Sequence, residues 1–226
     1  REVLRDLLRW ADVFTESFAP GAIARMGFDY DTVKELNPDI IMISSSLMGQ
    51  TGEWSGYAGF GNSAAAVTGF HALTGRPGQA PTGVFGPYTD FTSVRFNALA
   101  LLGALLHLRR TGDGQYIDMS QGEAALHFLA PECLRYLRDG VVRLANGNRD
   151  ARHAPQGVYR IAGLDRWLAV CIRSQVQWGA FCELAGLEDL ATMDLAARRA
   201  AHDDLDDRIQ RWTVDQDGVE LESRLQ

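Results

Sequence analysis

The side chain with the clearest chemical potential in this sequence is the carboxylate of Asp90. It follows a loop rich in glycine and proline, residues 83–89, and precedes an apolar run at 91–110 that predicts a long helix. Unpaired backbone N–H groups and the helix macrodipole keep a carboxylate at such a position ionised. An ionised carboxylate presented by a loop is suited to covalent nucleophilic catalysis. The alternative interpretation is structural, with Asp90 capping the helix by accepting the N–H of Thr92 or Ser93.

Two further groups of polar residues lie where predicted strands end. The first is the serine cluster Ser44 to Ser46, which closes the apolar run at 40–44 and lacks the G-x-S-x-G spacing of a serine hydrolase. Such a cluster indicates ligand contacts at the carboxyl edge of a sheet. The second is Arg25, one turn into a short helix beyond another predicted strand. This position suits a phosphate contact, and the alternative is an ordinary surface arginine.

Two other chemistries find little support. The stretch Gly59–Ala64 matches the dinucleotide fingerprint G-x-G-x-x-A, but the residues before it do not form the hydrophobic strand that such a site requires. We therefore expect a loop against an alanine-rich helix rather than a nicotinamide or flavin site. The five histidines are scattered without metal-ligand spacing, so no metal site is predicted.

Length and composition bound the class of protein. With 226 residues, of which 46% are hydrophobic and 23% charged, the chain is long enough for one large or two modest globular domains. A net charge of −7 disfavours nucleic acid and an anionic membrane as main partners. Arginine outnumbers lysine, so local positive patches for a phosphate-bearing ligand remain compatible with this charge.

Several features bear on where the protein works. The longest apolar stretch, 98–106, is too short to cross a bilayer, and no signal peptide is visible. Cys133, Cys171 and Cys182 occur in apolar contexts without C-x-x-C spacing, so we expect buried free thiols and a cytoplasmic location. The chain begins and ends inside amphipathic patterns, which indicates an internal piece of a longer protein.

The elements expected to position Asp90 alternate between strand and helix. Apolar runs at 11–15 and 40–44 and an alternating run at 115–119 predict strands, with helices between them. This order predicts part of a doubly wound parallel sheet. Ser120 has capping-box spacing and opens a further helix, which we expect Pro131 to kink.

The composition and the hydrophobic pattern of the sequence change beyond residue 140. A polar, turn-rich segment precedes a predicted hairpin at 157–172, and helical patterns run from Ser174 onward. The acidic run at 203–207 is expected to form a solvated helix face. We therefore expect an α/β protein in three parts: a partial Rossmann-like large domain over 1–140, a linker over 141–156, and a partial smaller α+β domain over 157–226.

Several segments, taken in order, resemble the class III CoA-transferase family (formyl-CoA transferase-like), which also contains carnitine CoA-transferases and α-methylacyl-CoA racemases. The segments are Glu16–Phe28, Leu36–Pro38, Gly49–Gly52, Arg110–Ser120, Gly147–Asp150 and Ala154–Tyr159, together with Asp90 before the long helix. They cover nearly the whole chain. The interval from Asp90 to the Thr-Gly-x-Gly-Gln turn fits the register of the family.

The resemblance implies transfer of CoA from an acyl-CoA donor to a small carboxylic acid acceptor. It makes Asp90 the nucleophile, which attacks the donor thioester to give a mixed anhydride and then an enzyme-bound aspartyl-CoA thioester. Coenzyme A is then a substrate, and no permanently bound cofactor is implied.

The resemblance also assigns the CoA contacts by position. They fall on seven residues: Ser17, Phe18, Arg25, Met26, Ser46, Leu47 and Met48. Phe18 and Met26 suit the apolar face of adenine or the pantetheine arm, and packing in the core is their alternative role. Arg25 suits a phosphate.

The same resemblance implies a homodimer of interlocked subunits, or a heteromer with a related subunit. Two alternative functions stay open. One is an α-methylacyl-CoA racemase, whose branch carries a basic His in a Gly-His-Asp stretch where this chain has Gly59-Phe60-Gly61. The other is a non-catalytic CoA-binding subunit paired with an active partner.

Overall fold

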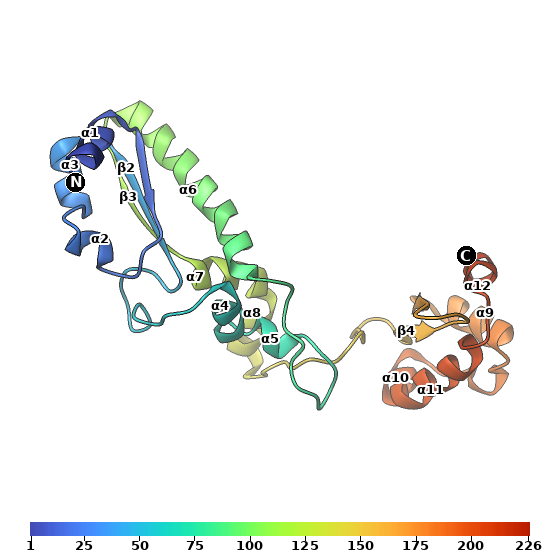
Figure 1. Ribbon diagram of the computed structural model, residues 1–226. Coiled ribbons are helices and arrows are strands. Elements are labelled where there is room, and N and C mark those ends of the chain that lie inside the picture. Colours follow the sequence, from blue (N-terminus) through green and yellow to red (C-terminus); the bar gives the residue numbers. More distant parts are fainter. The chain divides into compact units, whose positions relative to one another are not determined.

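The computed structural model describes residues 1–226, which divide into two compact units, Arg1–Ala145 and Asn146–Gln226 (Figure 1). The first unit contains α1 (Glu2–Trp10), β1 (Val13–Glu16), α2 (Ala22–Arg25), α3 (Tyr30–Leu36), β2 (Ile41–Ser46), α4 (Gly61–Val67), α5 (Phe70–Leu73), α6 (Tyr88–Thr111), β3 (Tyr116–Ser120), α7 (Gln121–Leu126), η1 (His127–Leu129) and α8 (Ala130–Asp139). The second contains β4 (Gln156–Arg160), β5 (Trp167–Cys171), α9 (Gln175–Ala185), η2 (Glu188–Leu190), α10 (Leu195–Ala200), α11 (His202–Thr213) and α12 (Gly218–Leu225).

A parallel sheet of three strands, in the order β1-β2-β3, forms the centre of the first unit. β2 pairs with both neighbours, so that Ile41 lies opposite Val13 and Met42 opposite Tyr116. Nearly all residues of β2 are buried, which explains why this strand is a continuous apolar run rather than an alternating one. The predicted α/β class with parallel strands is confirmed.

Helices cover both faces of this sheet (Figure 1). Successive side chains of a strand point to opposite faces, which separates Ile41 and Ile43 from Met42. The first two pack against Ala104 of α6 on one face. Met42 packs with Leu8 of α1 and Val33 of α3 on the other. The strands are therefore held between α6 and the amino-terminal helices, and their carboxyl ends form one edge.

The long helix α6 begins three residues earlier than the apolar pattern predicts, because Tyr88, Thr89 and Asp90 already form its first turn. It ends at Thr111 and is capped by Gly112, whose φ of 80° glycine adopts without strain. By length and composition alone this 24-residue helix could cross a membrane, contrary to the expectation from the shorter apolar stretch. The core helix of a soluble protein passes the same test.

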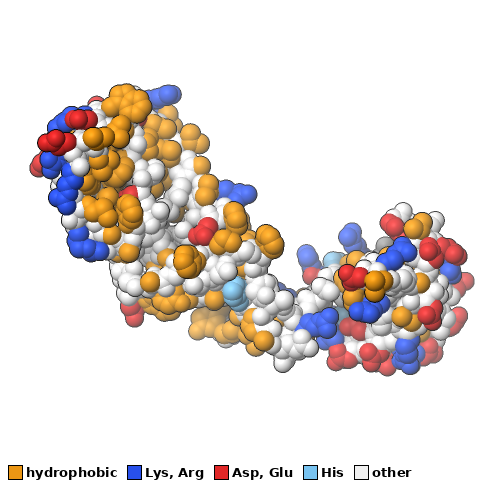
Figure 2. Space-filling view, viewed as in Figure 1, with side chains coloured by type: hydrophobic (Ala, Val, Ile, Leu, Met, Phe, Trp, Pro, Cys, Tyr) orange, Lys and Arg blue, Asp and Glu red, His pale blue; other side chains and the backbone are white.

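One side of α6 remains uncovered in the first unit. Apolar side chains follow this helix in Figure 2, and only 17% of its most apolar window is buried. The exposed members are Val94, Leu99, Leu102 and Leu106. A contiguous exposed apolar surface of this kind usually marks a surface that binds a partner.

The second unit packs an antiparallel hairpin, β4-β5, against helices, and this confirms the hairpin predicted at 157–172. Its core gathers around Trp178, Phe181, Leu205 and Ile209. The hydroxyl of Ser174 caps α9 by accepting the N–H of Gln177, which explains why the helices begin directly after the hairpin.

Two local predictions are wrong. Pro131 does not kink one continuous helix, because α7 ends at Leu126 and Pro131 lies in the first turn of α8. A proline is well tolerated there, since the first N–H groups of a helix have no intrahelical partner. Cys133 is exposed rather than buried, because α8 buries none of its residues and its apolar side chains therefore form no core around the thiol. Cys171 is half-buried, Cys182 is buried, and all three thiols are free.

Candidate active site

Asp90 occupies the third position of α6 and is half-buried. The N-cap of this helix is Pro87, and no side chain caps it, so the interpretation of Asp90 as an N-cap is wrong. Its backbone N–H donates to the carbonyl of Pro87 at 3.0 Å, and its own carbonyl accepts the Ser93 hydroxyl at 3.3 Å. These contacts fix the backbone of Asp90 and leave its carboxylate in the first turn of the helix.

A buried threonine next to Asp90 ties the starts of three helices together. The Thr89 hydroxyl lies 3.1 Å from the carbonyl oxygen of Gly61, the first residue of α4. It also lies 3.2 Å from Oε1 of Gln121, the first residue of α7. Thr89 is completely buried, so this hydroxyl does not exchange its partners for water. Asp90 is therefore presented where α4, α6 and α7 begin.

The loop after β2 joins the same region through α7. The N–H of Gly122 donates to the carbonyl of Leu47 at 3.0 Å. A Cβ on Gly122 would lie 2.9 Å from the sulfur of Met48, so the loop packs closely on the glycine. Leu47 and Met48, two predicted CoA contacts, thereby lie against the start of α7, which itself packs on α6.

The loop between β1 and α2 carries Ser17 and Phe18, and the end of α2 carries Arg25 and Met26. Phe18 is 49% exposed and Met26 is 42% exposed, so the alternative role of these two residues in core packing is wrong. Ser17 and Arg25 are exposed as well, whereas Ser46 at the end of β2 is buried. The start of the loop after β1 is held by a hydrogen bond in which the N–H of Phe18 donates to Glu16 Oε2 at 2.7 Å.

Gln50 connects the two loops at the carboxyl edge of the sheet. Its side-chain oxygen accepts the N–H of Gly21 at 3.4 Å, and its own N–H donates to the carboxylate of Asp118 at 2.9 Å. Three buried polar atoms nearby have no hydrogen-bond partner in the chain: Glu16 Oε1, Ser46 Oγ and Gln50 Nε2. Buried polar atoms are nearly always paired, so this edge is chemically suited to a polar ligand.

Tyr116 at the start of β3 stays uncharged at neutral pH. Burial raises the pKa of its phenol, and the negative charges of Asp118 and Glu16 raise it further. Its ring stacks on Tyr30 with 5.4 Å between centroids. Tyr116 therefore provides a partly exposed aromatic contact to Tyr30 at this edge.

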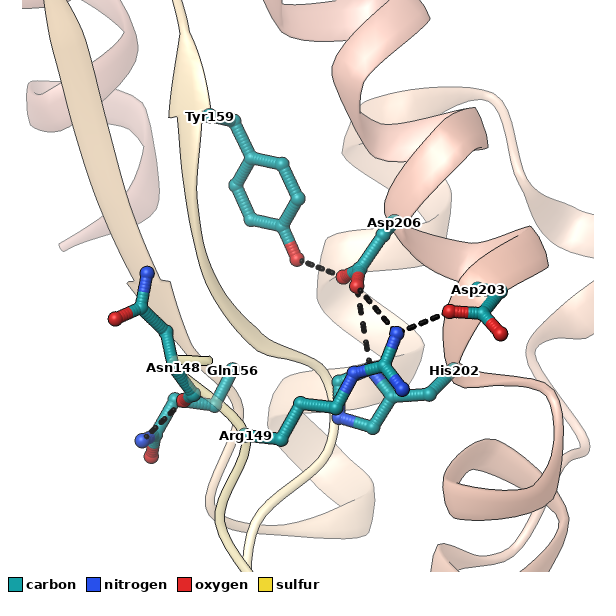
Figure 3. A network of polar contacts seen from close by, with 7 residues as sticks. All are labelled: Asn148, Arg149, Gln156, Tyr159, His202, Asp203 and Asp206. Carbon is teal, nitrogen blue, oxygen red and sulfur yellow. Dashed lines mark hydrogen bonds and ion pairs between the residues drawn. The ribbon is translucent and has the colours of Figure 1, made fainter. Parts of the chain in front are cut away.

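The segment Gly147–Asp150 is fastened within the second unit by a polar network (Figure 3). Arg149 pairs with Asp203 and lies 3.4 Å from Asp206 on α11. The Tyr159 hydroxyl donates to Asp206 at 2.8 Å, and His202 Nδ1 lies 3.5 Å from the same carboxylate. The hydrogen bond from Arg149 lowers the pKa of Asp203. Asp203, Asp204 and Asp207 are exposed, as expected of a solvated helix face, whereas Asp206 is half-buried because Arg149 and Tyr159 contact it.

Sequence reasoning pointed to Asp90 and the loop residues but not to Gly61, Thr89, Gln121 and Gly122, which the structure places around the start of α6 and α7. Their roles depend on contacts between residues about thirty or more apart, and a single sequence carries no signal for such contacts. The G-x-G-x-x-A match has no strand directly before it, since β2 ends at Ser46 and α4 begins at Gly61. This is the context that argued against a dinucleotide site.

Comparison with known proteins places this chain in a family. Residues 1–226 match the family described as CoA-transferase family III. The chain is 32% identical over 193 residues to acetyl-CoA:oxalate CoA-transferase of Acetobacter aceti, a match that covers 85% of this chain and 49% of that protein. It is 30% identical over 224 residues to succinyl-CoA–D-citramalate CoA-transferase of Chloroflexus aurantiacus, covering 97% of this chain and 56% of that protein.

The fold agrees with these relatives. A crystal structure of a CaiB/BaiF family protein from Brucella suis superposes with a TM-score of 0.86 at 27% identity, covering 99% of this chain and 60% of that one. The chain belongs to CoA-transferase family III, which confirms the resemblance seen in the sequence. It spans about half the length of the curated relatives that it matches.

Proposed function

We propose that the protein containing this chain transfers CoA from an acyl-CoA to a carboxylic acid, with Asp90 as the covalent nucleophile. The observation that carries this proposal is the half-buried Asp90 carboxylate in the first turn of α6, where α4 and α7 also begin. Membership of the family and the activities named for its relatives, which pair a CoA thioester with a dicarboxylic or hydroxy acid, support the same class of reaction.

The proposed chemistry conserves the activated acyl bond. A carboxylate oxygen of Asp90 attacks the thioester carbonyl, the C–S bond breaks, and CoA leaves as a thiolate beside a mixed anhydride. The thiolate then attacks the Asp90 carbonyl and expels the first acid, which leaves an aspartyl-CoA thioester. An incoming carboxylate reverses these steps and departs as its CoA ester. Backbone N–H groups at the start of α6 are suited to stabilise the oxyanion that forms in each step.

The CoA molecule is proposed to lie along the carboxyl edge of the sheet. The exposed Arg25 is suited to a phosphate, and the exposed Phe18 and Met26 offer apolar surface to adenine or the pantetheine arm. Ser17, Ser46, Leu47 and Met48 complete the proposed contacts. Leu47 and Met48 lie nearest to the start of α7, so the thiol end of the ligand is proposed to pass there toward Asp90.

The assembly is proposed to be a homodimer. The exposed apolar side of α6 supports a protein partner, because such a surface is costly to leave in water.

The three free thiols support the expected cytoplasmic location, since disulfides are rare there.

The proposal is tested with Asp90→Asn in the full-length protein, using succinyl-CoA and acetyl-CoA as donors and a panel of dicarboxylic acids as acceptors. Asparagine keeps the shape of the side chain but cannot form the anhydride. We expect kcat to fall by at least about a thousandfold, as is common when a nucleophile is removed. Asp113→Asn, in the exposed turn after α6, is the matched control. Transfer at the control rate in Asp90→Asn would remove Asp90 from the mechanism.

A further inference from the structure

Gly61 and Asp90 are in direct contact although they are far apart in the sequence. A Cβ built on Gly61 would lie 2.8 Å from Cγ and 2.9 Å from Oδ2 of Asp90. It would also lie 2.8 Å from the carbonyl oxygen of Pro87. Carbon atoms of side chains do not approach other atoms this closely, so even a methyl group does not fit unless a neighbour moves. The reason for glycine here is space, because the backbone of Gly61 is not in the left-handed region.

The surroundings of this contact decide which group would move. α4 is held in place by Ala64 and Ala65, which are completely buried, and by the Thr89 hydroxyl at the Gly61 carbonyl. The Pro87 carbonyl accepts the N–H of Asp90 at 3.0 Å, which fixes it to the first turn of α6. The half-buried side chain of Asp90 can turn away, which relieves two of the three close approaches. The third requires a backbone shift at Pro87, and this shift also moves Asp90 because its N–H donates to that carbonyl.

We propose that Gly61 is a positioning residue for Asp90: its missing side chain lets the carboxylate rest against the first residue of α4 and sets the direction from which the carboxylate meets a thioester. This inference rests on the function proposed above. A methyl group at position 61 turns the carboxylate away from that direction. Misplacement of a reacting group by about 1 Å can cost on the order of a hundredfold in rate.

The test compares Gly61→Ala with Gly179→Ala in the full-length protein. Gly179 also lies inside a helix, α9, but no atom lies within 4 Å of a Cβ built there. Single-turnover mixing with succinyl-CoA, and in parallel with acetyl-CoA, measures both the rate constant and the amplitude of aspartyl-CoA formation. For Gly61→Ala we expect the rate constant to fall by roughly a hundredfold with a full amplitude and with KM for the donor changed by less than about threefold. Gly179→Ala should match the wild type.

The amplitude separates positioning from damage to the fold. A lower amplitude with an unchanged rate constant means that part of the protein has unfolded, and it overturns the positioning role, as does a wild-type rate. A crystal structure of Gly61→Ala adds a readout that needs no substrate. We expect the Asp90 carboxylate to be displaced from its wild-type position, and an undisplaced carboxylate contradicts the inference.

The results that would refute the proposed function differ from those that would refute the role of Gly61. If the wild type forms no aspartyl adduct while Asp90→Asn still transfers CoA, the nucleophile is wrong whatever Gly61 does. If Asp90 is required and Gly61→Ala behaves as the wild type, only the role of Gly61 is wrong.

Discussion

A carboxylate is a weak nucleophile in water, and its reactivity toward a thioester depends on where the protein holds it. Asp90 is held by its backbone in the first turn of α6, while α4 limits its side chain on one face. No side chain caps this helix end. The N–H groups of Tyr88 and Asp90 donate to the carbonyls of Gly86 and Pro87, so those of Thr89 and Phe91 are the ones left for charge that develops in the proposed reaction.

Arg25 provides a prediction at the scale of a single residue. Its exposed guanidinium is proposed to contact a phosphate of CoA, and a hydrogen bond to a charged group contributes about 1.5–3 kcal/mol. Replacing it by alanine should therefore raise KM for the acyl-CoA donor by roughly ten- to a hundredfold, with kcat changed by less than about threefold. Steady-state kinetics over a range of donor concentrations measures this split.

The control for Arg25 is Arg5→Ala, which removes another exposed arginine from α1 of the same unit. It should leave KM unchanged. A variant of Arg25 that loses kcat at an unchanged KM would place this residue in the chemical step and refute its assignment to a phosphate.

The residues of the site differ in how far the sequence could reveal them. Asp90 was visible because glycine and proline before it and an apolar run after it mark a loop that enters a helix. Gly61 and Thr89 were not, because their importance lies in contacts between residues 28 or more positions apart. The sequence did not decide whether Phe18 and Met26 are core residues or ligand contacts, because that depends on their exposure, which only the structure gives.

At the scale of elements, the second unit depends on the contact between β4 and α11. Tyr159 is buried, and its hydroxyl donates to Asp206. Burial raises the pKa of Tyr159, and the hydrogen bond to Asp206 raises it further. A raised pKa in the folded state means that stability is fully present below the unfolded value of about 10 and is lost as the pH rises above it.

Tyr159→Phe should change the stability of this unit in two ways. At neutral pH the lost hydrogen bond lowers the free energy of unfolding by about 1 kcal/mol. Above about pH 10 the stability of the variant should fall less steeply than that of the wild type, because one phenol no longer titrates. Urea unfolding from pH 7 to 11, followed by the fluorescence of the buried Trp178, measures both effects. Tyr136→Phe, at an exposed position on α8, is the control, and identical pH profiles for the wild type and Tyr159→Phe would refute the account.

Elements were predicted well where local patterns decide them. The central strand, the long helix and the carboxyl-terminal hairpin follow from apolar runs and turn residues, and the structure confirms them. The start of α6 was placed too late because Tyr88 and Thr89 interrupt the apolar pattern, although Thr89 is buried by α4 and α7. Three aspartates of α11 face solvent as expected, and only the half-buried Asp206 differs, because its partners Arg149 and Tyr159 lie 57 and 47 residues away.

At the scale of the whole molecule, the exposed side of α6 is the surface with the clearest consequence. Leu99, Leu102 and Leu106 lie close to one another along the helix and are all at least half exposed. If this surface is buried in the proposed homodimer, Leu102→Lys should shift the protein toward monomer by placing a charge in an apolar interface. Sedimentation velocity over a range of concentrations measures the shift.

Leu164→Lys is the control for the interface, because Leu164 lies in the hairpin turn and is almost fully exposed. It should leave the oligomeric state unchanged. A dimer that survives Leu102→Lys would show that α6 faces something else. Flotation of the wild type with lipid vesicles would then distinguish a bilayer, which the length and composition of α6 also permit, from a different protein partner.

The measurement that tests the central claim most directly is the capture of the covalent intermediate. The full-length protein is mixed with succinyl-CoA or acetyl-CoA, quenched within a turnover with or without hydroxylamine, digested and mapped by mass spectrometry. We predict a CoA-linked peptide whose modified residue is Asp90, conversion of Asp90 to a hydroxamate when hydroxylamine is present, and neither product in Asp90→Asn. Rapid CoA transfer with an unmodified Asp90, or with the adduct on another residue, would contradict the account.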